Sequence, residues 1–207
     1  MLAPFDRSSI RVLPLADRRN KLDIARDAVD PASYEPELSP EALAAARAAA
    51  REARAARARG APVILAFGAH SIKNGLGPLL ARLLAEGGVT HLATNGAGII
   101  HDWEFAYQGR TGEDVRRYVE EGQFGIWEET GTYLNLALAV GAWRGLGYGE
   151  SVGAMVVEDG LPIPSDAELA RAIAAGAAPD AGEEELAGAG AVADLRALLK
   201  RSGIEPG

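Results

Sequence analysis

Two short apolar runs with a leucine-striped segment between them constrain this fold more than any other feature. Val63–Phe67 lies between Pro62 and Gly68, a pattern that favours a strand buried on both faces. Val89–Thr94 has the pattern of a second strand. Between the two runs, leucines at helical spacing predict one apolar stripe that packs on the sheet: Leu76, Leu79, Leu80, Leu83 and Leu84. We therefore expect neighbouring parallel strands joined by a right-handed crossover.

Composition excludes several classes of protein. The chain has 207 residues, of which 48% are hydrophobic and 24% charged, enough for a real core. It has no cysteine, which excludes disulfide scaffolds, thiol catalysis, thiolate zinc sites and iron–sulfur clusters. A net charge of -8 argues against a general affinity for nucleic acid or anionic membranes. No apolar run approaches the ~20 residues of a membrane span, and the N-terminus lacks a signal peptide's apolar core, so we expect a cytoplasmic protein with no membrane partner.

Changes in texture suggest three regions. Residues 1–38 are expected to form an N-terminal arm, residues 39–160 an α/β nucleotide-binding-like domain, and residues 161–207 an Ala/Gly-rich helical tail. Within the tail, residues 174–191 are nearly all alanine, glycine and acidic residues, which is typical of a flexible linker or a poorly packed segment. A last helix is expected over residues 192–200.

Capping signals place the other helices. Ser39 and Pro40 begin a helix that Gly60 ends, and Arg47, Arg51 and Arg54 on one of its faces indicate a solvated surface or an anion-binding stripe. The turn over residues 68–75 leads into the leucine helix. Further helices are expected at residues 99–107, after a Thr111 cap, at residues 127–143, and after a Ser165 cap.

The chemistry-bearing side chains gather in two turns, each directly after a predicted strand. In open α/β sheets, ligands bind at the carboxyl ends of the strands, near helix N-termini. The first turn offers Gly68, Ala69, His70, Ser71, Lys73, Asn74 and Gly75. The second offers Thr94, Asn95, Gly96, Ala97, Gly98, His101, Asp102 and Glu104. Small residues let backbone amides approach a phosphate, Lys73 could neutralise it, and the His101–Glu104 segment could transfer protons or bind a ribose.

Each of these features also has a plainer interpretation. Glycines after strands often only make tight turns, and N-G-A-G lacks the full dinucleotide spacing. His70 and His101 could be structural, hydrogen-bonded residues, and His91 alternates with apolar neighbours as a strand residue does. Glu128 and Glu129 have the position of first-turn helix acids. A mononuclear metal site could draw on His70, His101, Asp102 and Glu104, although the chain has no H-x-x-x-H or H-E-x-x-H spacing.

The segment FGAHSIKNGLGPLLARLLAEGGVTHLATNGAGIIHDWEFAYQGRTGEDV resembles the N-terminal half of the deoxyhypusine synthase superfamily, and most closely its bacterial deoxyhypusine-synthase-like members. RVLPLADRRNKL upstream and FGIWEETGTYLN downstream also fit that group, so the resemblance covers roughly residues 10–160. It implies a Rossmann-like parallel sheet with flanking helices that holds NAD. By this resemblance, Gly68–Gly75 and Thr94–Gly98 contact the dinucleotide.

The chain departs from the superfamily in two places. The paired acids that follow the second turn in the family fall on Ile100 and His101, and the next acid falls on Asp102. After Gly160 we find neither the superfamily's G-T-D-I-I-H-type segment nor its catalytic lysine, for which Lys200 in a tail helix is no substitute. We therefore expect the C-terminal half of the superfamily fold to be missing, and authentic deoxyhypusine synthesis to be absent.

Two main hypotheses of function follow. In the first, the domain binds NAD and uses Lys73, His101 and Asp102 in proton or hydride chemistry on a small amine or amino-acid-like substrate. In the second, it is a catalytically inactive oligomerisation or binding module; a metal-dependent hydrolase is third. The resemblance and an uncovered sheet edge predict a homo-oligomer. Its interface is expected to include Trp127, Tyr133, Trp143 and Tyr148, unless the helix at residues 192–199 folds back over them.

Overall fold

A computed structural model describes residues 10–204 and shows a mixed α/β protein. It divides into two compact units. We call them the sheet unit, Arg19–Arg117, and the helical unit, whose described residues are 10–18 and 118–204. The predicted boundaries at residues 38 and 160 do not coincide with this division, because a strand of the predicted arm belongs to the sheet unit and the tail helices pack on an earlier helix. No helix among the described residues is long and apolar enough to cross a membrane.

The expected pair of parallel strands lies in the sheet unit. β2, Ile64–Ala66, pairs in parallel with β3, His91–Ala93, and α4, Gly77–Ala85, lies between them in the chain. Within residues 10–204 this sheet has two strands. Leu65 packs on the core while Ile64 is 64% exposed, so the prediction of a strand buried on both faces is wrong. Because the sheet has two strands within the described residues, one face of β2 packs on the core and its other face is exposed.

A small apolar core joins the helices of the sheet unit to these strands. Ile72 of α3 (Ala69–Lys73), Leu80 of α4 and Phe105 of α5 (Gly96–Gln108) are buried together. α3 is a short helix where we expected a turn, and α5 begins three residues before the predicted start. Of the leucine stripe, Leu80 enters the core, whereas Leu84 is 43% exposed, so the stripe packs only in part as predicted.

A second pair of strands brings the N-terminal arm into the sheet unit. β1, Asn20–Asp23, pairs antiparallel with β4, Arg110–Glu113, and α1, Ile24–Asp27, follows β1. The register sets Leu22 opposite Thr111. Thr111 is therefore a strand residue, and the prediction that it caps a helix is wrong. Asp114 accepts a hydrogen bond from the backbone N–H of Arg117 instead, at the start of α6, Val115–Glu120.

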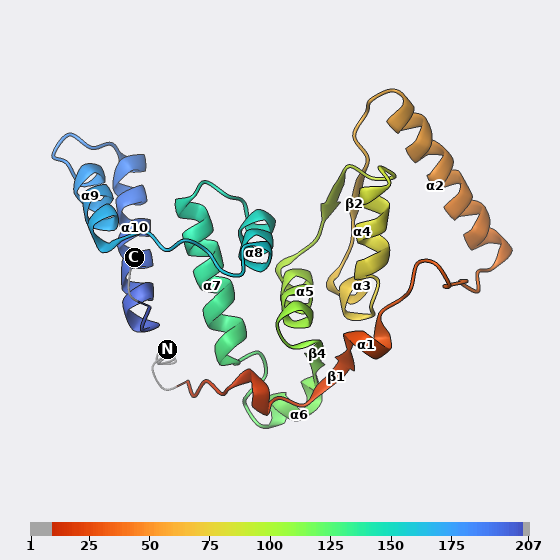
Figure 1. The fold of residues 1–207 in the computed structure, drawn as a ribbon, viewed down its shortest axis with the longest axis horizontal. Coiled ribbons are helices and arrows are strands. Elements are labelled where there is room, and N and C mark those ends of the chain that lie inside the picture. Colours follow the sequence, from red (N-terminus) through yellow and green to blue (C-terminus); the bar gives the residue numbers. More distant parts are fainter. Residues whose placement is uncertain (1–9, 205–207) are drawn as a thin grey trace, which may run out of the picture. The chain divides into compact units, whose positions relative to one another are not determined.

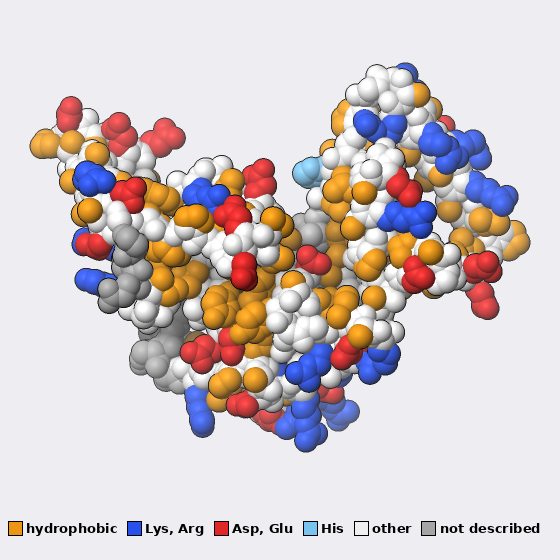
Figure 2. Space-filling model, in the orientation of Figure 1, with side chains coloured by type: hydrophobic (Ala, Val, Ile, Leu, Met, Phe, Trp, Pro, Cys, Tyr) orange, Lys and Arg blue, Asp and Glu red, His pale blue; other side chains and the backbone are white. Residues whose placement is uncertain are grey.

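The helix α2, Pro40–Ala58, confirms its predicted signals. The Ser39 hydroxyl accepts a hydrogen bond from the Ala42 N–H, and Pro40 occupies the first turn. No residue of α2 is buried, and Arg47, Arg51 and Arg54 are exposed. The arginine side chains along this helix lie on the surface in Figure 2. This agrees with the interpretation of a solvated face.

The helical unit is a set of packed helices that follow a 3-10 turn at Leu15–Asp17. Its helices are α7 (Glu128–Trp143), α8 (Tyr148–Val157), α9 (Asp166–Gly176) and α10 (Glu183–Arg201). α7, α9 and α10 share one core of five buried residues: Leu136, Val140, Leu169, Leu195 and Leu199. The predictions of a helix over residues 127–143 and of a Ser165 cap are confirmed. Glu128 and Glu129 are indeed first-turn acids of α7.

Most of the Ala/Gly-rich segment belongs to two helices that pack on each other, so the prediction of a flexible linker or a poorly packed segment over residues 174–191 is wrong. α10 begins nine residues before the predicted helix start. A Cβ atom on Gly176 would lie 2.7 Å from the Glu185 carbonyl oxygen and 2.9 Å from the Ala189 Cβ atom. Small residues therefore let α9 and α10 approach closely, and the Asp166–Arg196 ion pair links the same two helices.

The predicted interface aromatics divide into two classes. Trp127 is buried: its ring packs edge-on against Tyr118 with centroids 5.0 Å apart, and the Arg18 guanidinium lies 5.6 Å from the ring centroid. The expectation that Trp127 lies between subunits is therefore wrong, because its own unit already covers it. Tyr133, Trp143 and Tyr148 are exposed. α10 does fold back on α7, but it leaves these three rings partly open.

Candidate functional site

Both predicted turns lie at the same edge of the parallel pair. β2 runs into Gly68, the N-cap of α3, and β3 runs through Thr94 into Asn95, the N-cap of α5. Because the two strands are parallel, both helices begin at the carboxyl ends of the strands, and α3 and α5 pack against each other (Figure 1). The structure thus brings together the two groups of residues that sequence reasoning singled out.

Several of the candidate binding residues have structural tasks. Gly75 has φ +82° and its position admits no Cβ atom, which would lie 2.0 Å from the Asp27 carbonyl oxygen. A Cβ atom on Gly98 would lie 2.5 Å from the Thr94 hydroxyl, so this glycine lets the first turn of α5 pack on the end of β3. The Asn95 side chain accepts a hydrogen bond from the Gly98 N–H and caps α5. These contacts explain the four residues without a ligand.

Gly68 is different, because a Cβ atom there would meet no atom within 4 Å. Its backbone is open to approach from outside. The other residues of the two turns lie along the first turns of their helices or at the α3 C-terminus: Ala69, His70, Ser71, Asn74, Gly96 and Ala97. His70 and Asn74 are exposed, and Ser71 is half-buried. His91 is an exposed residue of β3, as its interpretation as a strand residue predicts.

A hydrogen-bonded chain of three side chains links α5 to β4. His101 Nδ1 lies 2.8 Å from the Thr111 hydroxyl oxygen, and that hydroxyl donates to a carboxylate oxygen of Glu104. Thr111 and Glu104 are 0% and 1% exposed, whereas His101 is half-buried. Burying an ionised carboxylate is costly unless donors satisfy it, so this hydroxyl is part of what holds Glu104 inside.

The local sequence explains why these three residues meet. His101 and Glu104 are three residues apart on α5, which puts them on one face of the helix. α5 ends at Gly109, whose left-handed conformation, φ +71°, turns the chain back. Thr111 follows two residues later, and its pairing with Leu22 in the β1–β4 ladder fixes its position beside that face.

Lys73 lies against the same strand. A Cβ atom on Gly112, the neighbour of Thr111, would lie 3.5 Å from the Lys73 Cε atom, so the lysine's methylene chain packs over this glycine. Lys73 is half-buried, and its ammonium group has no hydrogen bond or ion pair among the described residues. Lys21 of β1, by contrast, pairs with Asp114 at 3.1 Å. Two predicted catalytic residues, Lys73 and His101, therefore contact adjacent residues of β4.

Asp102, the third predicted catalytic residue, lies next to His101 on α5 but projects differently. Asp102 is exposed to solvent on one side, and partial burial of its carboxyl group on the other side raises the pKa of that group. Among the described residues no group of three or more histidine, aspartate and glutamate side chains is arranged to hold a metal ion. His70 and Asp102 do not join the His101–Thr111–Glu104 chain.

Sequence reasoning missed two features. Thr111 was interpreted as a cap, and only a β1–β4 pairing, which the sequence signals weakly, would have revealed it as the partner of His101 and Glu104.

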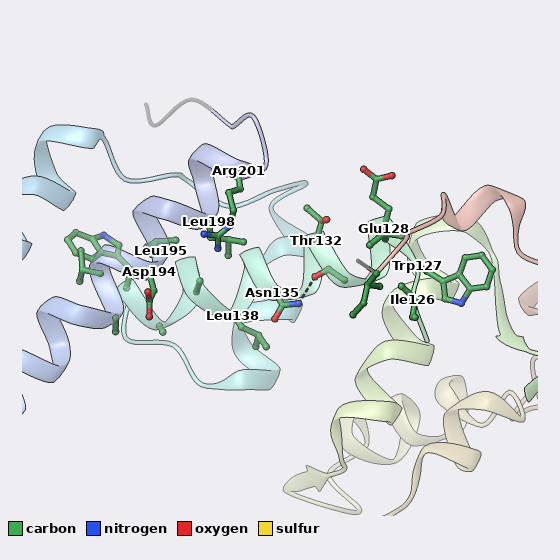
Figure 3. A pocket seen from close by; sticks show the side chains of 18 of the residues that line it. Ile126, Trp127, Glu128, Thr132, Asn135, Leu138, Asp194, Leu195, Leu198 and Arg201 are labelled. Atoms are coloured by element: carbon green, nitrogen blue, oxygen red, sulfur yellow. Dashed lines mark hydrogen bonds between the residues drawn. The ribbon is translucent and has the colours of Figure 1, made fainter. Parts of the chain in front are cut away.

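The helical unit also holds an apolar groove of about 1180 Å³ between α7 and α10 (Figure 3). Leu138, Leu195 and Leu198 line it, and Glu128, Asp194 and Arg201 add charges. Its walls come from three distant segments, so no local pattern predicts it.

No family model, no curated protein and no solved structure matches this chain.

Proposed function

We propose that the sheet unit is a deoxyhypusine-synthase-like domain that binds a nucleotide cofactor, NAD, where β2 and β3 run into α3 and α5. The observation that carries this proposal is that Lys73 packs on Gly112 and His101 contacts Thr111, and that the helices bearing them begin at the shared carboxyl edge of two parallel strands. Ligands of open α/β sheets bind at such edges. The choice of NAD rests on the resemblance of residues 10–160 to the superfamily.

The residues present fit a dinucleotide in three respects. The ammonium group of Lys73 is a cation without a carboxylate partner among residues 10–204, and lysine is a common ligand of phosphate. The backbone at Gly68 is open to close approach. α5 is a helix of 13 residues, so its N-terminus adds a positive partial charge at the same edge. Bound there, NAD would supply hydride transfer.

The chain's own residues would bind and orient the substrate and move protons. Lys73 would neutralise a phosphate, and Asp102, whose pKa is raised, would bind a ribose hydroxyl or exchange a proton. His101 would accept a proton from a small amine or amino-acid-like substrate.

The rival function is that of an inactive oligomerisation module. It is favoured by Ile64, exposed on a sheet whose strands pair with no third strand among the described residues, and light scattering over a concentration series tests it.

Calorimetric titration of the full chain with NAD and NADH tests the main proposal. We expect saturable binding that Lys73→Met weakens about tenfold, the loss of roughly one charge-assisted contact. Lys21→Met is the matched control, because that lysine lies in the same unit but already has Asp114 as its partner. Equal affinities for the two variants, or no heat with either nucleotide, would reject the proposed site.

A further inference from the structure

We propose that Glu104, acting through Thr111, holds His101 with its proton on Nδ1 and makes Nε2 the atom that accepts a proton. The inference deepens the proposed function, on which its catalytic part rests. Glu104 and Thr111 are positioning residues, since their proposed effect on the substrate passes through His101. Neither was predicted to have this role.

The donor and acceptor count on Thr111 carries the argument. A threonine hydroxyl has one hydrogen to donate and lone pairs to accept. The Thr111 hydroxyl donates this hydrogen to a carboxylate oxygen of Glu104. At the His101 contact of 2.8 Å the hydroxyl oxygen must then be the acceptor, and Nδ1 must be the donor. In a neutral imidazole, a proton on Nδ1 leaves the lone pair of the ring on Nε2.

Burial gives this arrangement its stability. Thr111 is 0% and Glu104 1% exposed, so water does not compete for the hydroxyl hydrogen. Reversing these hydrogen bonds would direct the hydroxyl hydrogen to His101 and remove the hydrogen bond from Thr111 to Glu104, an expensive loss for a buried carboxylate. The β1–β4 ladder fixes the backbone of Thr111, and the i, i+3 spacing on α5 fixes the two residues it joins.

The chemical consequence is a general base. The bond between hydrogen and a nitrogen or oxygen atom of the substrate breaks, its electron pair stays on that atom, and the proton forms a bond to Nε2. The Nδ1–H bond persists and remains directed to Thr111. The carboxylate of Glu104, one hydroxyl away, stabilises the imidazolium that forms. This is the logic by which a buried acid orients a catalytic histidine, here with a threonine inserted between them.

The tautomer can be measured directly in the free protein by two-bond ¹H–¹⁵N correlation spectra of the histidine rings at a pH where His101 is neutral. We expect a protonated Nδ1 and an unprotonated Nε2 for His101. Thr111→Ser, which keeps the hydroxyl, retains this pattern. Thr111→Val, which loses it, makes the Nε2–H form the major one. His70 and His91 do not belong to the hydrogen-bonded chain of His101, Thr111 and Glu104, so we expect their patterns to stay constant. A change in their patterns would report a general change in the protein.

A wild-type His101 with its proton on Nε2 would overturn the proposal, as would a folded Thr111→Val protein whose His101 pattern is unchanged. Should Thr111→Val fail to fold, the wild-type tautomer and its retention in Thr111→Ser still decide. The measurement needs no nucleotide. A protein that shows the Nδ1–H form but binds no NAD would therefore reject the proposed cofactor and leave the positioning role of Glu104 and Thr111 intact.

Discussion

Gly112 lies under the methylene chain of Lys73: a Cβ atom at Gly112 would be 3.5 Å from Lys73 Cε and 3.3 Å from Leu22 Cδ1. The glycine also has φ +79°, which other residues adopt only with strain. This one position therefore serves both the β1–β4 pair and the placement of the lysine that we assign to phosphate.

Gly112→Ala should destabilise the sheet unit and weaken NAD binding together. The backbone strain should cost about 1–2 kcal/mol, and the contact with Leu22 adds to it. Gly87→Ala is the control, because Gly87 has φ +72° but nothing within 4 Å of its Cβ position. Urea unfolding followed by circular dichroism measures the stability of both variants, and calorimetric titration measures their affinity for NAD. Equal losses of stability and equal NAD affinities in the two variants would contradict the contact with Lys73.

Gly98 and Gly68 should behave as a structural and a binding glycine, respectively. Gly98→Ala puts a Cβ atom against the Thr94 side chain and should cost about 1–3 kcal/mol of unfolding free energy. Thr94→Ala removes the obstructing atoms, so the double variant should recover much of that loss, a coupling that a double-mutant cycle measures. Additive losses would show that the clash is not the cause.

Gly68→Ala should leave the unfolding free energy within about 1 kcal/mol of the wild type, since its Cβ atom has open space and its φ is -88°. We expect it to weaken NAD binding, because the methyl group occupies the approach to the backbone. Calorimetry on this folded variant makes the comparison. Unchanged affinity would remove Gly68 from the binding site.

The docking of α10 should carry much of the stability of the helical unit. Leu199→Ala empties a fully buried position beside Leu136, Val140 and Leu169 and should cost about 2–5 kcal/mol. Leu186→Ala on the same helix is the control, because Leu186 is 51% exposed and its loss should change stability by about 0.5 kcal/mol or less. Similar effects of the two variants would mean that α10 does not pack as described.

Asp27 should titrate far below an ordinary aspartate. Hydrogen bonds from Arg26 and from the Asp23 N–H lower the pKa of its carboxyl group to about 2. Because the folded state favours the carboxylate, this contribution to stability is complete above the ordinary pKa of 3.8 and is lost as the pH falls from there toward 2. Carboxyl ¹³C NMR should find no Asp27 titration above pH 3.8, and Arg26→Gln should raise the midpoint. A midpoint near the ordinary value in the wild type would contradict the contact.

Local signals in the sequence predicted the strands and helix ends that depend on residues close to one another in the chain. The parallel β2–β3 pair, the Ser39 and Ser165 caps and the bounds of α7 follow from apolar runs and from residues that satisfy free backbone N–H groups. The shared edge at which α3 and α5 begin followed from the parallel pairing of β2 and β3 alone. These features involve residues that are close in sequence or joined by a single crossover.

Contacts between distant segments decided the rest. Thr111 meets His101 and Glu104 because β1 fixes β4, and β1 belongs to a segment whose sequence suggested only an arm. The exposed side of Ile64 reflects the number of strands, which the apolar run does not encode. The tail's small residues favoured disorder by composition, yet the same smallness lets Gly176 approach Ala189 in a packed helix pair.

The measurement that tests the account most directly is an amide ¹H–¹⁵N titration of the full chain with NAD. We predict saturable shifts at the amides of Gly68, Gly96 and Ala97 and at His101, with the resonances of Leu195 and Leu198 in the α7–α10 groove unchanged. Shifts confined to that groove, or no saturable shifts at the end of the β2–β3 pair, would contradict the claim that the sheet unit is a nucleotide-binding domain.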